Sequence, residues 1–189
     1  VTVSVAEPGT VAMSATLEAE PLVRYLDGAP ILSCPVRQHP ITIEYLPTHL
    51  DRPLAELVAS GVRRALQETT GDVLAFLPGV REIQQTLALI TERDVLALPL
   101  SGDLSPAEQD RVFAASPLRK VIAATNVAET SITIPGVTAV VDAGLARQAE
   151  FDATLGLNRL TLKPIARSAA DQRAGRAGRT GPGWCLRLW

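Results

Sequence analysis

Short apolar runs alternate with helix-like patterns through the middle of this chain, and this alternation is the strongest constraint on its fold. The segments 55–68 and 80–91 repeat apolar residues at the spacing of a helix. Four short apolar runs have the character of buried strands, at residues 73–77, 95–100, 120–124 and 137–141. The alternation predicts an α/β fold with a mainly parallel sheet and helices on both faces. Ligands of such sheets bind at the carboxyl ends of the strands.

Local signals indicate a third helix and a hairpin. Ser105 suits an N-cap, Pro106 suits the first helical position and Glu108 completes a capping box, so a helix is expected to run to about Ala115. Alternating leucines within residues 144–164 are typical of a protruding hairpin. Further strands are expected at residues 31–34, 41–46 and 184–188.

The composition indicates a globular protein, because 47% of the 189 residues are hydrophobic, enough for one full core. No apolar run approaches bilayer length and no signal-peptide pattern is found, so we expect a cytoplasmic protein without a membrane segment. Cys34 and Cys185 lie far apart without a CxxC pair, and the histidines are His39 and His49. We therefore expect no zinc site, no disulfide and two reduced core thiols.

The charge of the chain is nearly balanced, with 18 Lys and Arg against 20 Asp and Glu and a net charge of −2. A domain that held nucleic acid by electrostatics alone would usually carry a marked positive excess. Any contact with nucleic acid must therefore be local or shared with another domain.

Residues 172–179 read Gln-Arg-Ala-Gly-Arg-Ala-Gly-Arg, a pattern that on a helix forms a surface for anions. Gln172, Arg176 and Arg179 are spaced four and then three positions apart, so a helix projects them from one face. Arg173 lies about 100° around the helix from Gln172. The small residues between them let a polyphosphate approach closely, and two guanidiniums with one amide suit a transferring phosphoryl group.

An alternative for this segment is a solvated basic helix or a glycine-arginine tail that binds nucleic acid. Disordered tails lack a start signal, whereas Ser168 to Asp171 has the spacing of a capping box. The spacing predicts a helix that begins at Ser168 and is ended by Gly178, Gly181 and Pro182.

Six motifs occur in a fixed order: Ser14-Ala15-Thr16, Phe76-Leu77-Pro78-Gly79, Leu100-Ser101-Gly102, and residues 124–131, 141–144 and 172–179. Their order and spacing resemble the DEAH-box helicases of superfamily two over residues 13–189. The pair Thr-Asn-x-Ala-Glu-Thr-Ser and Gln-Arg-x-Gly-Arg-x-Gly-Arg is highly specific. The resemblance implies that residues 1–20 are the end of a first RecA-like lobe, with motif III and a linker. It also implies that residues 21–189 are the second RecA-like lobe, of the P-loop NTPase type.

The resemblance further implies a site for ATP with Mg²⁺. Gln172 would help to place the attacking water, and Arg176 and Arg179 would act as arginine fingers at the γ-phosphate. Phe113 occupies the position whose ring stacks on adenine, and its alternative is ordinary core packing of a helix. Pro135 stands where many relatives have an acid, so a ribose contact at that position is not implied.

Contacts with the backbone of single-stranded RNA are implied for four residues: Gly79, Ser101, Thr125 and Asn126. Their alternative is turn and capping chemistry, in which such residues are common. Coupling is implied for four others. Ser131 and Thr133 would link the nucleotide state to the RNA contacts, and Ser14 and Thr16 would link the two lobes.

The chain contains neither a GxxxxGK[ST] loop nor an Asp-Glu-Ala-His sequence. It therefore has half of an ATP site, with the metal held mainly by the absent first lobe, and we expect it not to hydrolyse ATP alone. We also expect it to come from a longer protein. The predicted function is the C-terminal motor lobe of an ATP-dependent RNA helicase. The alternatives are a non-catalytic RNA-binding or scaffold module of RecA-like fold, or a motor on DNA, because backbone contacts carry little base information.

Overall fold

The computed structural model describes residues 2–6, 10–14, 23–25, 30–33, 39–46, 52–129, 133–152 and 156–189. The chain forms two compact units, Val1–Gln38 and His39–Trp189. The first unit contains an antiparallel sheet of order β2-β1-β3, from β1 (Thr2–Ala6), β2 (Thr10–Ser14) and β3 (Ile31–Ser33). The strand expected at residues 31–34 is thus confirmed, whereas β1 and β2 carried no signal in the sequence.

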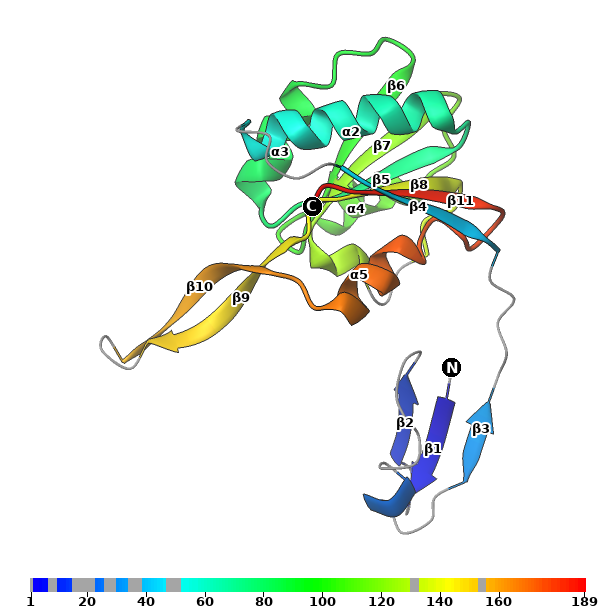
Figure 1. The fold of residues 1–189 in the computed structure, drawn as a ribbon, viewed down its shortest axis with the longest axis vertical. Coiled ribbons are helices and arrows are strands. Elements are labelled where there is room, and N and C mark those ends of the chain that lie inside the picture. The colour runs from blue at the N-terminus through cyan, green and yellow to red at the C-terminus, as the bar shows by residue number, and fades with distance from the viewer. Residues whose placement is uncertain are drawn as a thin grey trace. The chain divides into compact units, whose positions relative to one another are not determined.

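The second unit is built on a six-stranded sheet of order β4-β11-β8-β5-β7-β6, in which every neighbouring pair is parallel. Its strands are β4 (Ile41–Tyr45), β5 (Asp72–Phe76), β6 (Val95–Leu100), β7 (Arg119–Ala124), β8 (Val137–Asp142) and β11 (Gly183–Arg187). Its helices are α2 (Leu54–Glu68), α3 (Val80–Ala88), α4 (Pro106–Phe113) and α5 (Arg167–Ala174). The predicted α/β fold with a parallel sheet is confirmed (Figure 1).

Helices cover both faces of this sheet. Successive residues of a strand point to opposite faces, so each strand contributes side chains to two cores. Val73 and Ala75 of β5 belong to the core that α2 and α3 cover. Leu74 and Phe76 belong to the opposite core, with residues of α4 and α5. Every residue of the central strands therefore needs to be apolar or internally paired, which explains the continuous apolar runs in the sequence.

Helix α4 begins as its sequence predicts. The Ser105 hydroxyl accepts a hydrogen bond from the Glu108 N–H at 3.4 Å, and the Glu108 carboxylate accepts one from the Ser105 N–H at 2.9 Å. The hydrogen bonds from Ser105 lower the pKa of the Glu108 carboxyl. With Pro106 at the first helical position, the capping box is complete.

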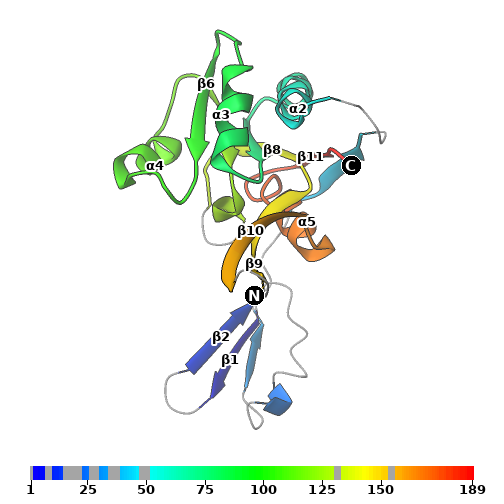
Figure 2. The same ribbon diagram turned by 90° about the vertical axis from the view of Figure 1, so that its left-hand side faces the viewer.

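The hairpin expected within residues 144–164 is confirmed, and it protrudes from the sheet (Figures 1 and 2). Strands β9 (Leu145–Asp152) and β10 (Leu157–Pro164) pair in antiparallel register, with Leu160 opposite Ala149. Glu150 and Lys163 form an ion pair of 2.9 Å on the hairpin.

Among the described residues, no helix is long and apolar enough to cross a membrane.

The prediction for residues 168–179 is wrong in two respects. Helix α5 begins at Arg167 after Ala166, without a side-chain cap, so the Ser168 spacing misplaced the start by one residue. The helix then ends at Ala174, because glycine at 175 disfavours continuation and the chain tightens into turns. The turns end where the Gly178 carbonyl accepts a hydrogen bond from the His39 N–H at 3.1 Å.

Candidate functional site

A groove of about 310 Å³ lies at the carboxyl ends of β5, β6 and β7. These strands are neighbours in the sheet, so the loops that follow them meet at one edge. The groove therefore brings together all four residues for which RNA contacts are predicted: Gly79, Ser101, Thr125 and Asn126.

Local backbone geometry holds these four residues in place. Gly79 precedes α3 and accepts a hydrogen bond from the Ile83 N–H at 3.0 Å. The Thr125 N–H donates to the Leu100 carbonyl at 3.1 Å, which ties the end of β7 to the end of β6. Asn126 begins the short 3₁₀ helix η1 (Asn126–Ala128) and is exposed, whereas Ser101 is buried.

The sequence patterns did not indicate several other residues of the groove, which are charged or apolar. Arg81, Asp103, Arg147 and Leu160 also line the groove. Arg147 comes from β9, which follows β8, the neighbour of β5, so its approach depends on the order of strands. A signal was available, because residues 145–147 directly follow the motif at 141–144.

Arg147 is held at the groove by Glu82. Its Nη2 atom donates to Glu82 Oε1 at 2.9 Å. A Cβ atom on Gly79 would lie 2.8 Å from Glu82 Oε2 and 3.1 Å from Arg147 Nε. A side chain at position 79 would therefore clash with this ion pair, and glycine avoids the clash.

Arg173 points into the protein. Its side chain is 1% exposed and donates to Asp142 Oδ1 at 2.8 Å and to Glu129 Oε2 at 3.1 Å. Its guanidinium also lies 4.8 Å from the centre of the Phe76 ring. Burial raises the pKa of the Asp142 carboxyl, whereas Arg173 and the Gly144 N–H act against this rise.

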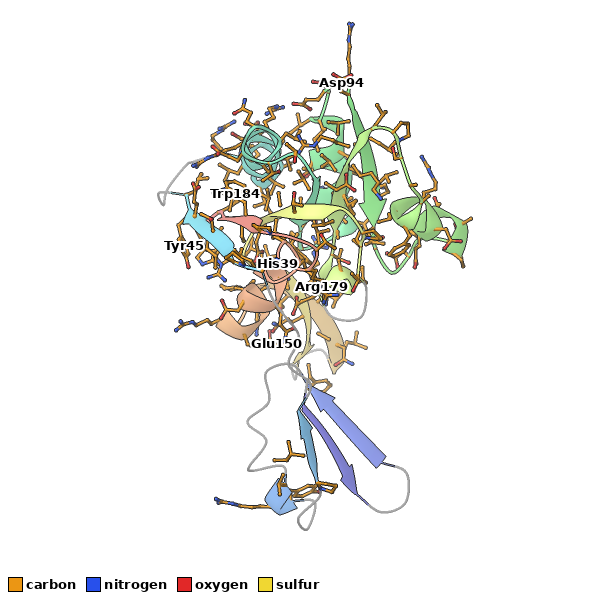
Figure 3. All side chains as sticks on the ribbon, turned by 90° about the vertical axis from the view of Figure 1, so that its right-hand side faces the viewer. His39, Tyr45, Asp94, Glu150, Arg179 and Trp184 are labelled. Atoms are coloured by element: carbon orange, nitrogen blue, oxygen red, sulfur yellow. The ribbon has the colours of Figure 1, made fainter. Side chains whose placement is uncertain are left out.

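Arg176 and Arg179 lie after α5, and together they line a small cleft with Leu74, Ile134 and Val137. Arg176 donates to the Glu129 carbonyl, and Arg179, which is exposed, donates to the Thr133 hydroxyl (Arg179 in Figure 3). Burial and the neighbouring Arg179 lower the pKa of Arg176 to about 10, whereas Glu129 raises it. The Arg176 guanidinium is therefore charged at neutral pH.

The cleft beside these two arginines has a volume of about 10 Å³, the space of a single water molecule. It cannot enclose a nucleotide. Among the described residues, no cluster of His, Cys, Asp and Glu could hold a metal ion.

The other predicted site residues are placed in part. Gln172 is half-buried on the last turn of α5, and Phe113 is half-buried at the end of α4, packed against the core. Ser14 ends β2 in the first unit. Thr16 and Ser131 lie outside the described residues. The roles predicted for these residues stay predictions, as does the lobe boundary between residues 20 and 21.

Comparison with known proteins decides the family. The family model described as the helicase conserved C-terminal domain matches residues 53–181. The chain belongs to this family.

Relatives of this helicase C-terminal domain include ATP-dependent RNA helicases of Escherichia coli strain K12. HrpA is 37% identical over 184 residues, which cover 93% of this chain and 14% of HrpA. HrpB is 41% identical over 181 residues, which cover 93% of this chain and 22% of HrpB. The chain thus spans less than a quarter of these relatives, and the resemblance to DEAH-box helicases is confirmed.

Solved structures confirm the fold. Two crystal structures of E. coli HrpB, one described as a DExH-box NTPase and one as a DEAH/RHA helicase, match with TM-scores of 0.84 and 0.85 at 40% identity. The matches cover 93% of this chain and 22% and 23% of the HrpB chains. The six-stranded unit is accordingly a RecA-like second lobe.

Proposed function

We propose that this chain is the C-terminal motor lobe of an ATP-dependent RNA helicase. The observation that carries the proposal is the groove at the strand ends, which gathers residues of three separate motifs beside two cations, Arg81 and Arg147. HrpA and HrpB are named as ATP-dependent RNA helicases, which favours RNA over DNA as the substrate.

Residues 172–179 would supply the groups that act in ATP hydrolysis. ATP with Mg²⁺ would bring a transferring phosphoryl group, whose charge is spread over several oxygens. Arg176 and Arg179 would place two guanidiniums against this charge, and Gln172 would help to orient the attacking water. The small cleft beside the arginines supports a nucleotide held mainly by the first lobe of the same protein, because it cannot enclose one itself.

The groove would bind the backbone of single-stranded RNA. Hydroxyl, amide and backbone groups at Ser101, Thr125 and Asn126 suit phosphate and sugar oxygens. The exposed Arg81 adds a positive charge, whereas Arg147 is already paired with Glu82. The balanced net charge of −2 is consistent with local contacts rather than a broad basic surface. ATP binding would close the two lobes, and hydrolysis would reopen them, so that the groove moves along one strand.

Thr125→Ala in the complete protein tests the groove. The change removes one hydroxyl that would bond a charged phosphate, so single-stranded RNA affinity should fall about tenfold. RNA-stimulated ATP turnover should fall with it, and basal turnover should fall less. Fluorescence anisotropy with two RNAs of unrelated sequence and a coupled ATPase assay measure these quantities.

Thr42→Ala is the matched control, because Thr42 is exposed on the edge strand β4, outside the groove. It should leave RNA affinity unchanged. Unchanged affinity in Thr125→Ala, or a loss confined to one base sequence, counts against backbone contacts at Thr125. A complete protein that binds RNA but never hydrolyses ATP supports the scaffold alternative instead.

A further inference from the structure

Glu129 contacts two arginines of the segment 172–179 through two different groups. Its carboxylate accepts a hydrogen bond from Arg173 Nε at 3.1 Å, and its backbone carbonyl accepts one from Arg176 Nη2. The Glu129 side chain is 17% exposed, so the ion pair is largely shielded from water. One residue therefore joins the inward arginine to an arginine proposed to act on phosphate.

The same residue is joined to the groove by a single turn. The Glu129 N–H donates to the Asn126 carbonyl at 2.9 Å, and the Ala128 N–H donates to the Thr125 carbonyl at 3.3 Å. Thr125 and Asn126 both line the groove. Two backbone hydrogen bonds within one 3₁₀ turn therefore connect these groove residues to the segment that ends at Glu129.

The other end of this link is fixed. Arg173 is held by Asp142 at the end of β8 and by the Phe76 ring, both at the centre of the fold. Because Asp142 also neutralises Arg173, the Glu129 carboxylate is not its sole counter-charge. The ion pair with Glu129 therefore anchors the turn to the core, and the Glu129 carbonyl accepts a hydrogen bond from Arg176.

We propose that Glu129 is a positioning residue that transmits RNA binding in the groove to Arg176. This role rests on the proposed function. RNA that contacts Thr125 and Asn126 shifts the turn that ends at Glu129. The Glu129 carboxylate, paired with Arg173, limits how far the Glu129 peptide can move. The Glu129 carbonyl then aligns the guanidinium of Arg176. Chains of hydrogen bonds and ion pairs of this kind can carry coupling between two sites.

Glu129→Ala in the complete protein removes the anchor and keeps the backbone carbonyl. The ratio of RNA-stimulated to basal turnover should fall roughly tenfold. RNA affinity and nucleotide affinity should change much less, because the side chain lies between the two surfaces and in neither. Glu129→Gln retains an acceptor for Arg173 and should restore part of the stimulation.

Asp171→Ala is the matched control, because it removes a carboxylate from α5, the helix that carries Arg173, and breaks the 2.7 Å ion pair with Arg187. A purely structural role for Glu129 would lower basal and stimulated turnover in parallel, along with the melting temperature, as in this control. That result overturns the proposal, and so does full stimulation in Glu129→Ala. Wild-type protein without RNA stimulation overturns the proposed function itself, and this role with it.

Discussion

Arg173 and Arg179 belong to one segment of eight residues, yet their surroundings are opposite. Arg173 is 1% exposed between two carboxylates and an aromatic ring, whereas Arg179 is exposed and donates to a threonine hydroxyl. Arg176 is 6% exposed, so it is buried like Arg173, but it donates to a backbone carbonyl. The comparison shows that one residue type, repeated at short spacing, serves the fold at one position and leaves its charge available at another.

The partners explain the difference. A buried guanidinium needs a carboxylate, since an unpaired charge in the core is very costly. Arg173 has Asp142 and Glu129, so its charge is satisfied internally. The neutral hydroxyl that Arg179 contacts leaves most of its positive charge able to attract a phosphate. The negative charge of Glu129, by contrast, compensates part of the charge of Arg176.

The largest effect expected is on catalysis at Arg176. Arg176→Ala in the complete protein should lower ATP turnover by roughly 10³ to 10⁵, as for other arginine fingers, because the charge is needed most in the transition state. Nucleotide affinity should change much less. Arg176→Lys should rescue poorly, since a point charge lacks the planar fork of the guanidinium. Steady-state kinetics and nucleotide titration measure both quantities.

The contrast between Arg173 and Arg176 would be contradicted if their effects on turnover were reversed. Turnover abolished by Arg173→Ala in a folded protein, together with a dispensable Arg176, would show that the inward residue carries the chemistry.

A smaller free-energy effect, on stability, is expected at Arg173. Arg173→Ala leaves Asp142 buried without its guanidinium partner, and should lower the free energy of unfolding by about 3–5 kcal/mol. Denaturant unfolding of the chain, followed by the fluorescence of buried Trp184, measures the change. The double variant Arg173→Met with Asp142→Asn also removes the buried charge of Asp142 and should recover part of the loss. Equal destabilisation in the single and double variants would argue against the ion pair as the cause.

Local chemistry explains what the sequence could predict. The cap at Ser105 and Glu108 lies within four residues, and the strand at 95–100 is a continuous apolar run, so both were found at the correct places. The four groove residues were found through motifs, and the parallel sheet explains why they meet.

The errors arise where distant residues decide the structure. After α5 ends at Ala174, the turns bring Gly178 against His39 and Ile41, which lie far away in the sequence. Arg147 reaches the groove only through the strand order and its bond to Glu82. Glu129 lies within a recognised motif, but its two arginine partners are more than forty residues away.

The smallest effect expected is at Thr133, whose hydroxyl accepts a hydrogen bond from Arg179. Thr133→Val keeps the shape of the side chain and removes this acceptor, so the exposed guanidinium of Arg179 is oriented less well. Turnover should fall about threefold, as expected for one hydrogen bond at the surface, and the melting temperature should not change. Thr42→Val on the exposed edge strand serves as the control. A loss as large as that of Arg176→Ala would mean that Thr133 itself contacts the reacting groups. No loss would mean that Arg179, unlike Arg173, needs no partner in this lobe to be correctly placed.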